Sequence, residues 1–331
     1  MNKIINYPGK KTLLISETNY TRKYLSNLDK NKKYLIITDD NLYKHYKDLL
    51  NDYDIIIEIV PNGETSKNFN TYLHILNVLF ENNFTRNDAI IAFGGGVITD
   101  LSLFVAGTYQ RGIDITLIPT SLLAMVDASI GGKCGINFNG CKNQIGMFYF
   151  PSQIIIDDAF LNTLPKEEYY NGFAEIIKCS LIKDKNMFEQ IENNEFNISD
   201  LIIKSIEIKL SVIENDIYDS KERKLLNFGH TYGHIIESDS NFQIKHGHAI
   251  AIGMYKETKD FIIKNRLYNL LSKFFDLNYE INNNIIYKYL QKDKKSTKNT
   301  IDVVELKNIG ESALITKPVE EVLNEYIWEK H

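Results

Sequence analysis

Four of the seven histidines of this 331-residue sequence fall between positions 230 and 248. His230 and His234 are four residues apart in NFGHTYGH, so on a helix their side chains would project from one face. His246 and His248 follow in HGH, where another helix is expected to begin. Imidazoles at these spacings favour a metal with nitrogen ligands, most naturally zinc, and His230 and His234 could both bind one ion. The alternative is that one or two of them are ordinary hydrogen-bonded helix residues.

A glycine-rich segment indicates phosphate binding. AFGGGVITD, residues 92–100, follows an expected strand and opens an expected helix, whose free N–H groups suit a phosphate. It lacks the GxGxxG spacing, so a tight structural turn is the alternative reading. Asp39 ends the first expected strand, and Glu64 and Lys67 follow the second. All three would lie at the carboxyl edge of a parallel sheet, where ligands bind.

The polar segment 124–146 is expected to be a loop. It carries Asp127, Lys133, Lys142 and Asn143, and glycine pairs beside lysines favour a phosphate cradle over a solvated connection.

Further cations accompany these motifs. Glu175 and Lys178 are three apart in NGFAEIIK, a spacing typical of a surface ion pair. Lys209, Arg223, Lys294 and Lys295 also stand beside motif-like residues. Several cations around one site, in a chain of net charge −5, would indicate a polyanionic substrate.

The bulk composition narrows the classes of function. The net charge gives no overall case for binding nucleic acid or an anionic membrane. Three cysteines without a CxxC pair suit a reducing compartment. No apolar run is long enough for a signal peptide or a membrane span, so a cytoplasmic location is expected.

The elements that must position these residues fall into two groups. Short β-branched runs at 33–38, 54–60, 88–93, 114–119 and 153–158 alternate at first with helical segments at 41–52 and 67–83. This alternation predicts a doubly wound, Rossmann-like parallel sheet. From about residue 160 the periodicity is mainly helical, as in 165–192, 199–216, 223–238 and 248–265, with a strand pair near 300–315. The expected domains are an α/β domain, 1–160, and a mainly helical domain, 161–331.

Six blocks of the sequence together resemble the 3-dehydroquinate synthase family of sugar-phosphate cyclases. They are FGGGVITDLSLFVAGTYQRG, IPTSLLAMVDASIGGKCGIN, KNQIG, LPKEEYYNGFAEIIK, RKLLNFGHTYGHIIE and HGHAIAIGM. The resemblance implies an NAD domain and a metal domain, usually in a homodimer. It also implies conversion of 3-deoxy-D-arabino-heptulosonate 7-phosphate to 3-dehydroquinate and phosphate, in the shikimate pathway of aromatic amino acid biosynthesis. In that reaction NAD oxidises the substrate transiently, phosphate is eliminated, the hydride returns and an aldol step closes the ring.

The resemblance also implies roles for individual residues. It makes Glu175, His230 and His246 ligands of zinc or cobalt, and it places His234 on the substrate side. The implied substrate residues are Asp127, Lys133, Lys142, Asn143, Lys178, Lys209, Arg223, Asn227, His234, Lys294 or Lys295, and Arg111, which would reach the neighbouring subunit's site. The implied NAD contacts are Asp39, Asn41, Glu64, Lys67, Gly94, Gly95, Gly96, Val97, Asp100, Thr120, Ser121, Lys142, Phe160 and Thr163.

The sequence departs from the family pattern at three places. His248 stands where an acidic residue is common, Cys134 where Thr is common and Phe150 where Gln is common. His248 would offer a metal a competing nitrogen. The competing functions are a sister cyclase that makes an inosose or valiolone, a metal-dependent polyol dehydrogenase, and a metal-binding protein without enzymatic activity.

Overall fold

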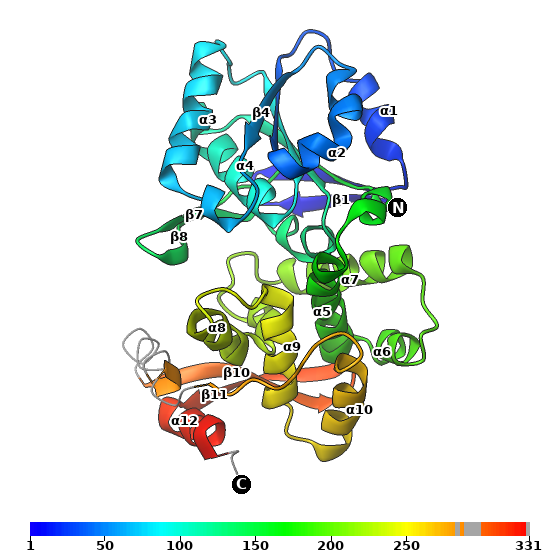
Figure 1. Cartoon of the computed structure of the whole chain (residues 1–331), viewed down its shortest axis with the longest axis vertical. Coiled ribbons are helices and arrows are strands. Elements are labelled where there is room, and N and C mark those ends of the chain that lie inside the picture. The colour runs from blue at the N-terminus through cyan, green and yellow to red at the C-terminus, as the bar shows by residue number, and fades with distance from the viewer. Residues whose placement is uncertain (282–284, 288–298, 329–331) are drawn as a thin grey trace. The chain divides into compact units, whose positions relative to one another are not determined.

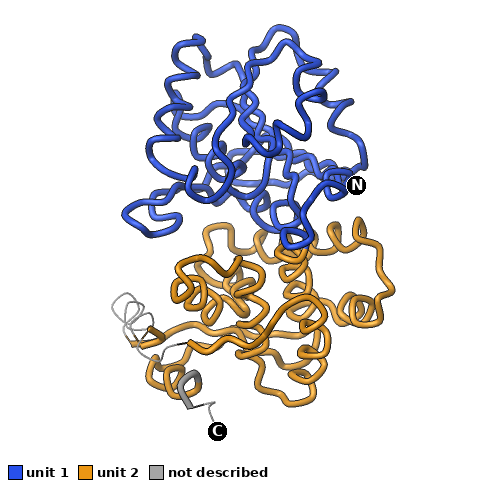
Figure 2. The backbone as a smooth tube through the Cα atoms, viewed as in Figure 1, with its two compact units in different colours: residues 1–169 blue, residues 170–331 orange. Residues whose placement is uncertain are grey.

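The computed structural model describes residues 1–281, 285–287 and 299–328 of the chain (Figure 1). It divides into two compact units, Met1–Tyr169 and Tyr170–His331 (Figure 2). Lys294 and Lys295, expected to contact the substrate, lie outside the described residues. Among the residues that the structure describes, no helix combines the length and the apolar character needed to cross a bilayer.

Unit 1 is built on a seven-stranded sheet in the order β1-β2-β9-β6-β5-β3-β4. The strands are β1 (Asn2–Tyr7), β2 (Lys10–Ser16), β3 (Tyr34–Asp39), β4 (Ile56–Val60), β5 (Ala89–Gly94), β6 (Asp114–Pro119) and β9 (Gln153–Ile156). All neighbours pair in parallel except β1 and β2, which form an antiparallel hairpin. The five strands expected from β-branched runs are therefore confirmed. The hairpin at the amino terminus was not expected, although exposed and less exposed residues alternate along β1.

The helices of unit 1 follow the strands as expected. They are α1 (Tyr20–Ser26), α2 (Asp40–Asn51), α3 (Phe69–Glu81) and α4 (Gly96–Thr108). α4 contacts β3, β5 and β6, and nearly every residue from Ile98 to Gly107 is buried. α4, which begins at the glycine segment, is thus packed firmly against the sheet. This packing holds the first turn of α4 in place.

The segment 124–146 corrects the expectation of a loop. After a π-helical turn at Ala124–Ala128, it forms an antiparallel hairpin of β7 (Lys133–Phe138) and β8 (Cys141–Phe148). Two of its glycines allow the strands to approach closely, because a Cβ on Gly146 would lie 2.4 Å from the Cys134 carbonyl oxygen. Asn139 and Gly140 form the turn with positive φ, and Asn-Gly is the sequence signal of such a hairpin.

Unit 2 is mainly helical, as expected, with one strand pair. The helices are α5 (Lys166–Lys183), α6 (Lys185–Glu192), α7 (Ile198–Ile213), α8 (His230–Asp239), α9 (His246–Glu257), α10 (Phe261–Leu271) and α12 (Val319–Trp328). β10 (Thr300–Asn308) and β11 (Glu311–Pro318) form an antiparallel hairpin, which confirms the strand pair expected near 300–315.

One expected helix is interrupted. The helical periodicity of 223–238 is broken into a 3₁₀ helix, Glu222–Asn227, and α8, because Gly229 takes a φ of 77° between them. Asn227 therefore does not lie one helical turn before His230 on the same helix. His230 becomes the first residue of α8.

The division between the units falls at 169, nine residues after the boundary expected from the sequence. The intervening segment packs on unit 1. The Phe160 ring contacts the rings of Phe93 and Tyr46, and the hydroxyl groups of Thr163 and Tyr46 are 2.5 Å apart. These contacts assign residues just after 160 to unit 1, although the helical periodicity of the sequence begins at about 160.

Candidate functional site

Three side chains from three helices of unit 2 meet at one point. Oε1 of Glu175, on α5, lies 3.8 Å from Nε2 of His230 and 3.5 Å from Nε2 of His246. His230 and His246 are the first residues of α8 and α9. One ligand atom of each residue lies within 4.8 Å of the others, which makes the group able to hold a metal ion. Two imidazoles and a carboxylate form a ligand set that is typical of zinc.

The carboxylate of Glu175 has one free oxygen. Glu175 is 1% exposed, and its Oε1, which faces the two imidazoles, has no hydrogen-bond partner among the described residues. Its other oxygen accepts a hydrogen bond from Nζ of Lys178, which is 2% exposed. The surface ion pair expected from the i,i+3 spacing is therefore wrong, since the pair is buried. A buried carboxylate oxygen without a donor is costly, and a bound cation would satisfy it.

Both imidazoles direct Nε2 toward Glu175 because their Nδ1 atoms are engaged elsewhere. Nδ1 of His230 is 3.2 Å from the Phe228 carbonyl oxygen, to which it can only donate. Nδ1 of His246 is 3.4 Å from Oε2 of Glu237, which is 5% exposed. Such outer partners fix the tautomer of metal-binding histidines. The sequence reasoning missed Glu237, although it lies three residues after His234 on the expected helix, a spacing that places both on one face.

The electrostatics of the group are those of a tightly coupled cluster. Burial opposes ionisation of Glu175, but the positive charge of Lys178 and that of the nearby His246 outweigh it and lower the pKa of Glu175 to about 2. Burial and the charge of Lys178 lower the pKa of His230 well below its usual range, so this imidazole is neutral. Burial opposes protonation of His246, but the neighbouring carboxylates of Glu175 and Glu237 raise its pKa to about 9. A metal ion would replace the proton of His246 as the positive charge beside Glu175.

Glycines bring α8 and α9 close enough for this contact. A Cβ on Gly253 would lie 2.0 Å from the Gly229 carbonyl oxygen, and a Cβ on Gly233 would lie 2.6 Å from Cδ1 of Ile250. At the start of α9, a Cβ on Gly247 would lie 2.0 Å from the Asn171 carbonyl oxygen, which brings α9 against α5. The three helices that carry the three side chains are therefore in backbone contact.

His234 and His230 do not share a metal group in the described part of the chain. His230 groups with Glu175 and His246, whereas His234 groups with Glu237 and His246. The His234 side chain is 44% exposed, against 13% for His230. His248 is directed elsewhere, because its Nε2 lies 2.6 Å from the Asp276 carbonyl oxygen. The expected competition from His248 is therefore not present in this structure.

The remaining predicted residues of unit 2 are cations and an amide on neighbouring elements. Lys209 on α7 is 5% exposed and Arg223 in the 3₁₀ helix is 3% exposed, whereas Asn227 is exposed. Asp216 holds the segment that carries Arg223, since its carboxylate accepts hydrogen bonds from the backbone N–H groups of Ser220, Lys221 and Arg223. Among the described residues of unit 2, Lys178, Lys209 and Arg223 are buried cations, and such side chains are rarely buried unless they are paired.

In unit 1 the predicted cofactor residues lie at the carboxyl ends of adjacent parallel strands. Asp39 ends β3, Glu64 and Lys67 follow β4, Gly94 ends β5, and Thr120 follows β6. Asp39 accepts a hydrogen bond from the Leu42 backbone N–H at the start of α2, and burial raises its pKa. The expectation that these residues gather at one edge of the sheet is confirmed.

Lys67 is the centre of a polar cluster at this edge. Its Nζ lies 2.5 Å from Oδ2 of Asp100 and 2.5 Å from Oδ1 of Asn143. Asn137, on β7, joins the other members, donating to Oε1 of Glu64 at 2.7 Å and accepting from the Asn143 backbone N–H at 2.9 Å. Burial raises the pKa of Asp100 against the effect of Lys67. Sequence reasoning missed Asn137 because its partners come together only when the hairpin folds against the β4 loop.

The glycine segment leaves the first turn of α4 accessible. Gly94 must be glycine, because a Cβ there would lie 2.5 Å from Cβ of Ile98. Gly95, Gly96 and Val97 are partly exposed, although most residues from Ile98 to Gly107 are buried. Backbone N–H groups at a helix start that reach the surface suit a phosphate.

The other predicted residues of unit 1 differ in exposure, and Arg111 lies between the end of α4 and the start of β6, at the amino edge of the parallel strands. Lys133, Lys142, Asn41, Thr163 and Arg111 are exposed, Asp127 and Ser121 are half-buried, and Phe160 is buried. Arg111 and its neighbour Gln110 have positive φ values of 66° and 48°. The chain thus makes an unusual turn where Arg111 is presented.

Families of known proteins match residues in both units of the chain. The family described as 3-dehydroquinate synthase N-terminal matches residues 57–171, and the family described as 3-dehydroquinate synthase C-terminal matches residues 172–296. The 3-dehydroquinate synthase of Clostridium beijerinckii is 40% identical and the alignment covers 93% of each chain. That of Dictyoglomus thermophilum is 41% identical, over 89% of this chain and 88% of the relative.

Solved structures share the fold. A 2-deoxy-scyllo-inosose synthase complexed with carbaglucose-6-phosphate, NAD+ and Co2+ has a TM-score of 0.85 and 24% identity, with 99% of each chain covered. A 2-epi-5-epi-valiolone synthase from Streptomyces hygroscopicus subsp. jinggangensis 5008, with NAD+ and Zn2+ bound, has a TM-score of 0.85 and 21% identity, over 98% of this chain and 96% of the other. The expected fold, a Rossmann-like unit followed by a mainly helical one, is confirmed. With family matches over both units and relatives about 40% identical along most of its length, this chain belongs to the 3-dehydroquinate synthase family.

Proposed function

We propose that this chain converts 3-deoxy-D-arabino-heptulosonate 7-phosphate to 3-dehydroquinate and phosphate, the reaction that names its family. Its cofactors would be NAD and one divalent metal ion, zinc or cobalt. The observation that carries the proposal is the free Oε1 of Glu175, which faces two imidazole Nε2 atoms in a unit that also buries three cations. A metal beside buried cations suits a substrate with a carboxylate and a phosphate.

We assign NAD to unit 1 and the metal and most substrate contacts to unit 2. The support in unit 1 is the accessible first turn of α4, with Asp39 and the Lys67 cluster at the same sheet edge. The support in unit 2 is the group of Glu175, His230 and His246. When bound, the metal supplies Lewis acidity toward a substrate oxygen and NAD supplies a reversible hydride acceptor.

The chain's own residues would bind and orient the substrate. Lys178, Lys209 and Arg223 are buried cations whose positive charge favours carboxylate and phosphate groups in a site shielded from water. His230 is held neutral, which keeps its Nε2 lone pair available. Fixing a flexible sugar phosphate through such groups contributes about 7–11 kcal/mol in favourable cases.

A phosphate-release assay tests the function. With the heptulosonate phosphate, NAD and Zn2+, we expect release of phosphate and formation of 3-dehydroquinate without net NADH, because the hydride returns in each turnover. When protein freed of its cofactors is assayed without added NAD, or with a metal chelator, phosphate release should be abolished. Phosphate release that persists without both cofactors would refute the proposal.

Two controls separate the competing functions. Sugar phosphates without a carboxylate should be poor substrates, because they offer one negative group fewer to the positive charges of Lys178, Lys209 and Arg223. Efficient cyclisation of such a heptulose or glucose phosphate would instead assign the chain to a sister cyclase activity. Steady accumulation of NADH with glycerol would assign it to the polyol dehydrogenases.

We also propose that the chain acts as a cytoplasmic homodimer in which Arg111 contacts the neighbouring subunit's substrate. The support is the family to which the chain belongs and the exposed Arg111 in a turn of positive φ. Sedimentation of the purified protein at micromolar concentration measures the oligomeric state, and a monomer would contradict the role of Arg111.

Glu237 provides a prediction about the metal site. Because its carboxylate accepts from Nδ1 of His246, the variant Glu237→Ala should lower zinc affinity about 10–100-fold, the range usual for such outer partners. Glu237→Gln retains an acceptor oxygen and should lose less zinc affinity than Glu237→Ala. Competition with a chromophoric chelator measures both affinities. Unchanged zinc affinity in Glu237→Ala would show that the hydrogen bond does not orient His246.

A further inference from the structure

We propose that Glu257 is a positioning residue of the metal site, whose carboxylate fixes the first turn of α8 and with it His230. The inference rests on the metal site proposed above. Glu257 is the last residue of α9, the helix whose first residue is His246. One helix therefore carries one proposed ligand at its start and, at its end, the carboxylate that holds the helix of another ligand.

The contact is a two-point cap made by a neighbouring helix. Oε2 of Glu257 accepts from the Gly229 N–H at 2.7 Å, and Oε1 accepts from the Tyr232 N–H at 2.9 Å. These two N–H groups lie on either side of His230 in the chain. N–H groups of the first helical turn lack partners within the helix, and a carboxylate there also interacts favourably with the helix dipole. Gly229, the residue before the helix, has no side chain with which to cap it.

Close packing of the two helices brings the carboxylate to this position. Gly253, one turn before Glu257, lies against the Gly229 carbonyl so closely that a Cβ would approach it to 2.0 Å. A Cβ on Gly229 would in turn lie 2.7 Å from Cγ of Met254. The last turn of α9 and the first turn of α8 are therefore in backbone contact, and Glu257 spans the remaining distance.

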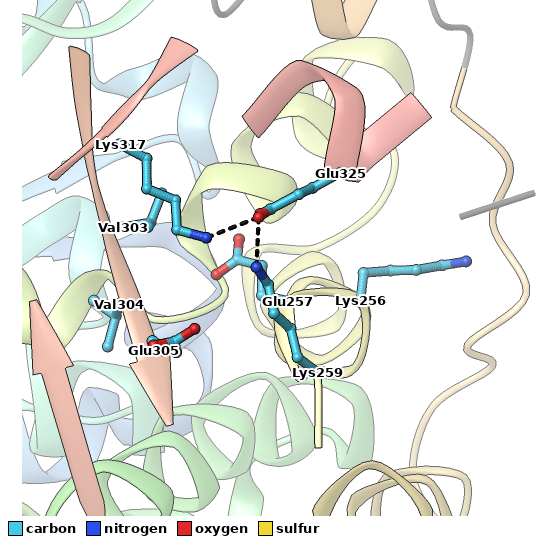
Figure 3. Close-up of a pocket in the computed structure, with 8 residues that line it drawn as sticks. All are labelled: Lys256, Glu257, Lys259, Val303, Val304, Glu305, Lys317 and Glu325. Atoms are coloured by element: carbon cyan, nitrogen blue, oxygen red, sulfur yellow. Dashed lines mark hydrogen bonds and ion pairs between the residues drawn. The ribbon is translucent and has the colours of Figure 1, made fainter. Parts of the chain in front are cut away.

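The end of α9 is itself anchored. Glu257 lines a small pocket with Lys256, Lys259, Val303, Val304, Glu305, Lys317 and Glu325 (Figure 3). Oε1 of Glu325, on α12, lies 2.6 Å from Nζ of Lys259 and 2.8 Å from Nζ of Lys317, on β11. These ion pairs tie the hairpin and α12 to the segment that directly follows Glu257. Because these ion pairs do not involve Glu257, they should still hold the end of α9 when the Glu257 carboxylate is removed. Its removal should therefore affect mainly the first turn of α8 and the placement of His230.

The test compares Glu257→Ala and Glu257→Gln with the wild-type chain. Zinc affinity is measured by chelator competition, and the environment of the metal by the visible absorption spectrum of the cobalt-loaded protein. We expect Glu257→Ala to lower zinc affinity about tenfold, the lower end for residues that act through a ligand, and to shift the cobalt spectrum. Glu257→Gln keeps one acceptor oxygen, so its zinc affinity should lie between that of the wild type and that of Glu257→Ala. Neither readout depends on turnover.

Two variants provide matched controls. Glu305→Gln removes the same charge from the same pocket, but its carboxylate bonds Lys307 within the hairpin, so zinc affinity should stay at the wild-type value. Met187→Ala opens a cavity at a fully buried position of α6 and lowers stability by a change outside α8 and α9. It should also keep zinc affinity, which separates loss of positioning from general loss of stability.

The outcomes distinguish this inference from the proposed function. Zinc affinity and a cobalt spectrum that are unchanged in both Glu257 variants would overturn the role of Glu257. Equal loss of affinity in Glu257→Ala, Glu305→Gln and Met187→Ala would overturn it as well. A wild-type chain that binds no zinc would refute the proposed metal site itself, and with it the role of Glu257 as a positioning residue of that site.

Discussion

His230→Ala should lose the metal, whereas His234→Ala should keep it and lose turnover. His230 directs Nε2 at the free oxygen of Glu175, and His234 does not belong to that group. Removing a hydrogen-bond partner of a metal ligand usually lowers metal affinity by about 10–100-fold. Removing the ligand itself should cost more, so we expect His230→Ala to lower zinc affinity by more than about 100-fold. His234→Ala should bind zinc within about threefold of the wild type, while turnover falls by about 10²-fold, the loss expected when a group that positions the substrate is removed.

Zinc content after dialysis and phosphate release measure the two effects separately. His248→Ala is the matched control, since its imidazole bonds the Asp276 carbonyl, and it should keep both metal and turnover. Equal metal loss in His230→Ala and His234→Ala would restore the simple reading of the HxxxH spacing, in which both histidines clamp one ion.

Lys178→Met should destabilise the metal-free protein by about 3 kcal/mol, the lower end of the cost of breaking a buried ion pair. Lys178 and Glu175 are both buried, so the change leaves a carboxylate without its lysine partner. We expect the lower end because His246, whose pKa is raised to about 9, still provides a positive charge at neutral pH. Added zinc should recover most of the lost stability, because the ion compensates the Glu175 charge.

Urea unfolding in chelator and in excess zinc measures this difference. Lys183→Met is the matched control on the same helix, because its side chain is 35% exposed and its pair with Glu222 is worth about 1 kcal/mol or less. A loss for Lys178→Met that is equally small, or that zinc does not reduce, would contradict the proposed coupling of Lys178, Glu175 and the metal.

The sign of the pH dependence of Glu175 follows from its pKa. That pKa is lowered to about 2 in the folded chain, below the value near 4.3 of an unperturbed glutamate. Ionisation of Glu175 therefore stabilises the folded state above the unfolded pKa, and this contribution disappears as the pH falls from about 4 toward 2.

The local pattern of the sequence was enough to predict most elements and the places where chemistry occurs. Alternating β-branched runs and helical segments predicted the parallel sheet, because a parallel strand is buried on both faces and reads as a continuous apolar run. The same logic placed Asp39, Lys67 and Gly94 at one edge of the sheet. A signal for the β7–β8 hairpin was present in Asn139–Gly140 but was not used. The polar composition of the segment hid the strand pair, of which β8 is largely exposed.

Tertiary structure decided which of these residues act together. The sequence gives Glu175 and Lys178 the spacing of a surface pair, and only the packing of α5 against other helices buries them. Sequence separation also conceals Glu237 beside His246, Asn137 beside Glu64, and Glu257 beside Gly229. Spacing along a helix determines the face on which a side chain lies, whereas its partners depend on contacts between helices that are distant in the chain. NFGHTYGH therefore placed two histidines on one face by itself, and the fold of α5, α8 and α9 directed one of them to Glu175 and the other to Glu237.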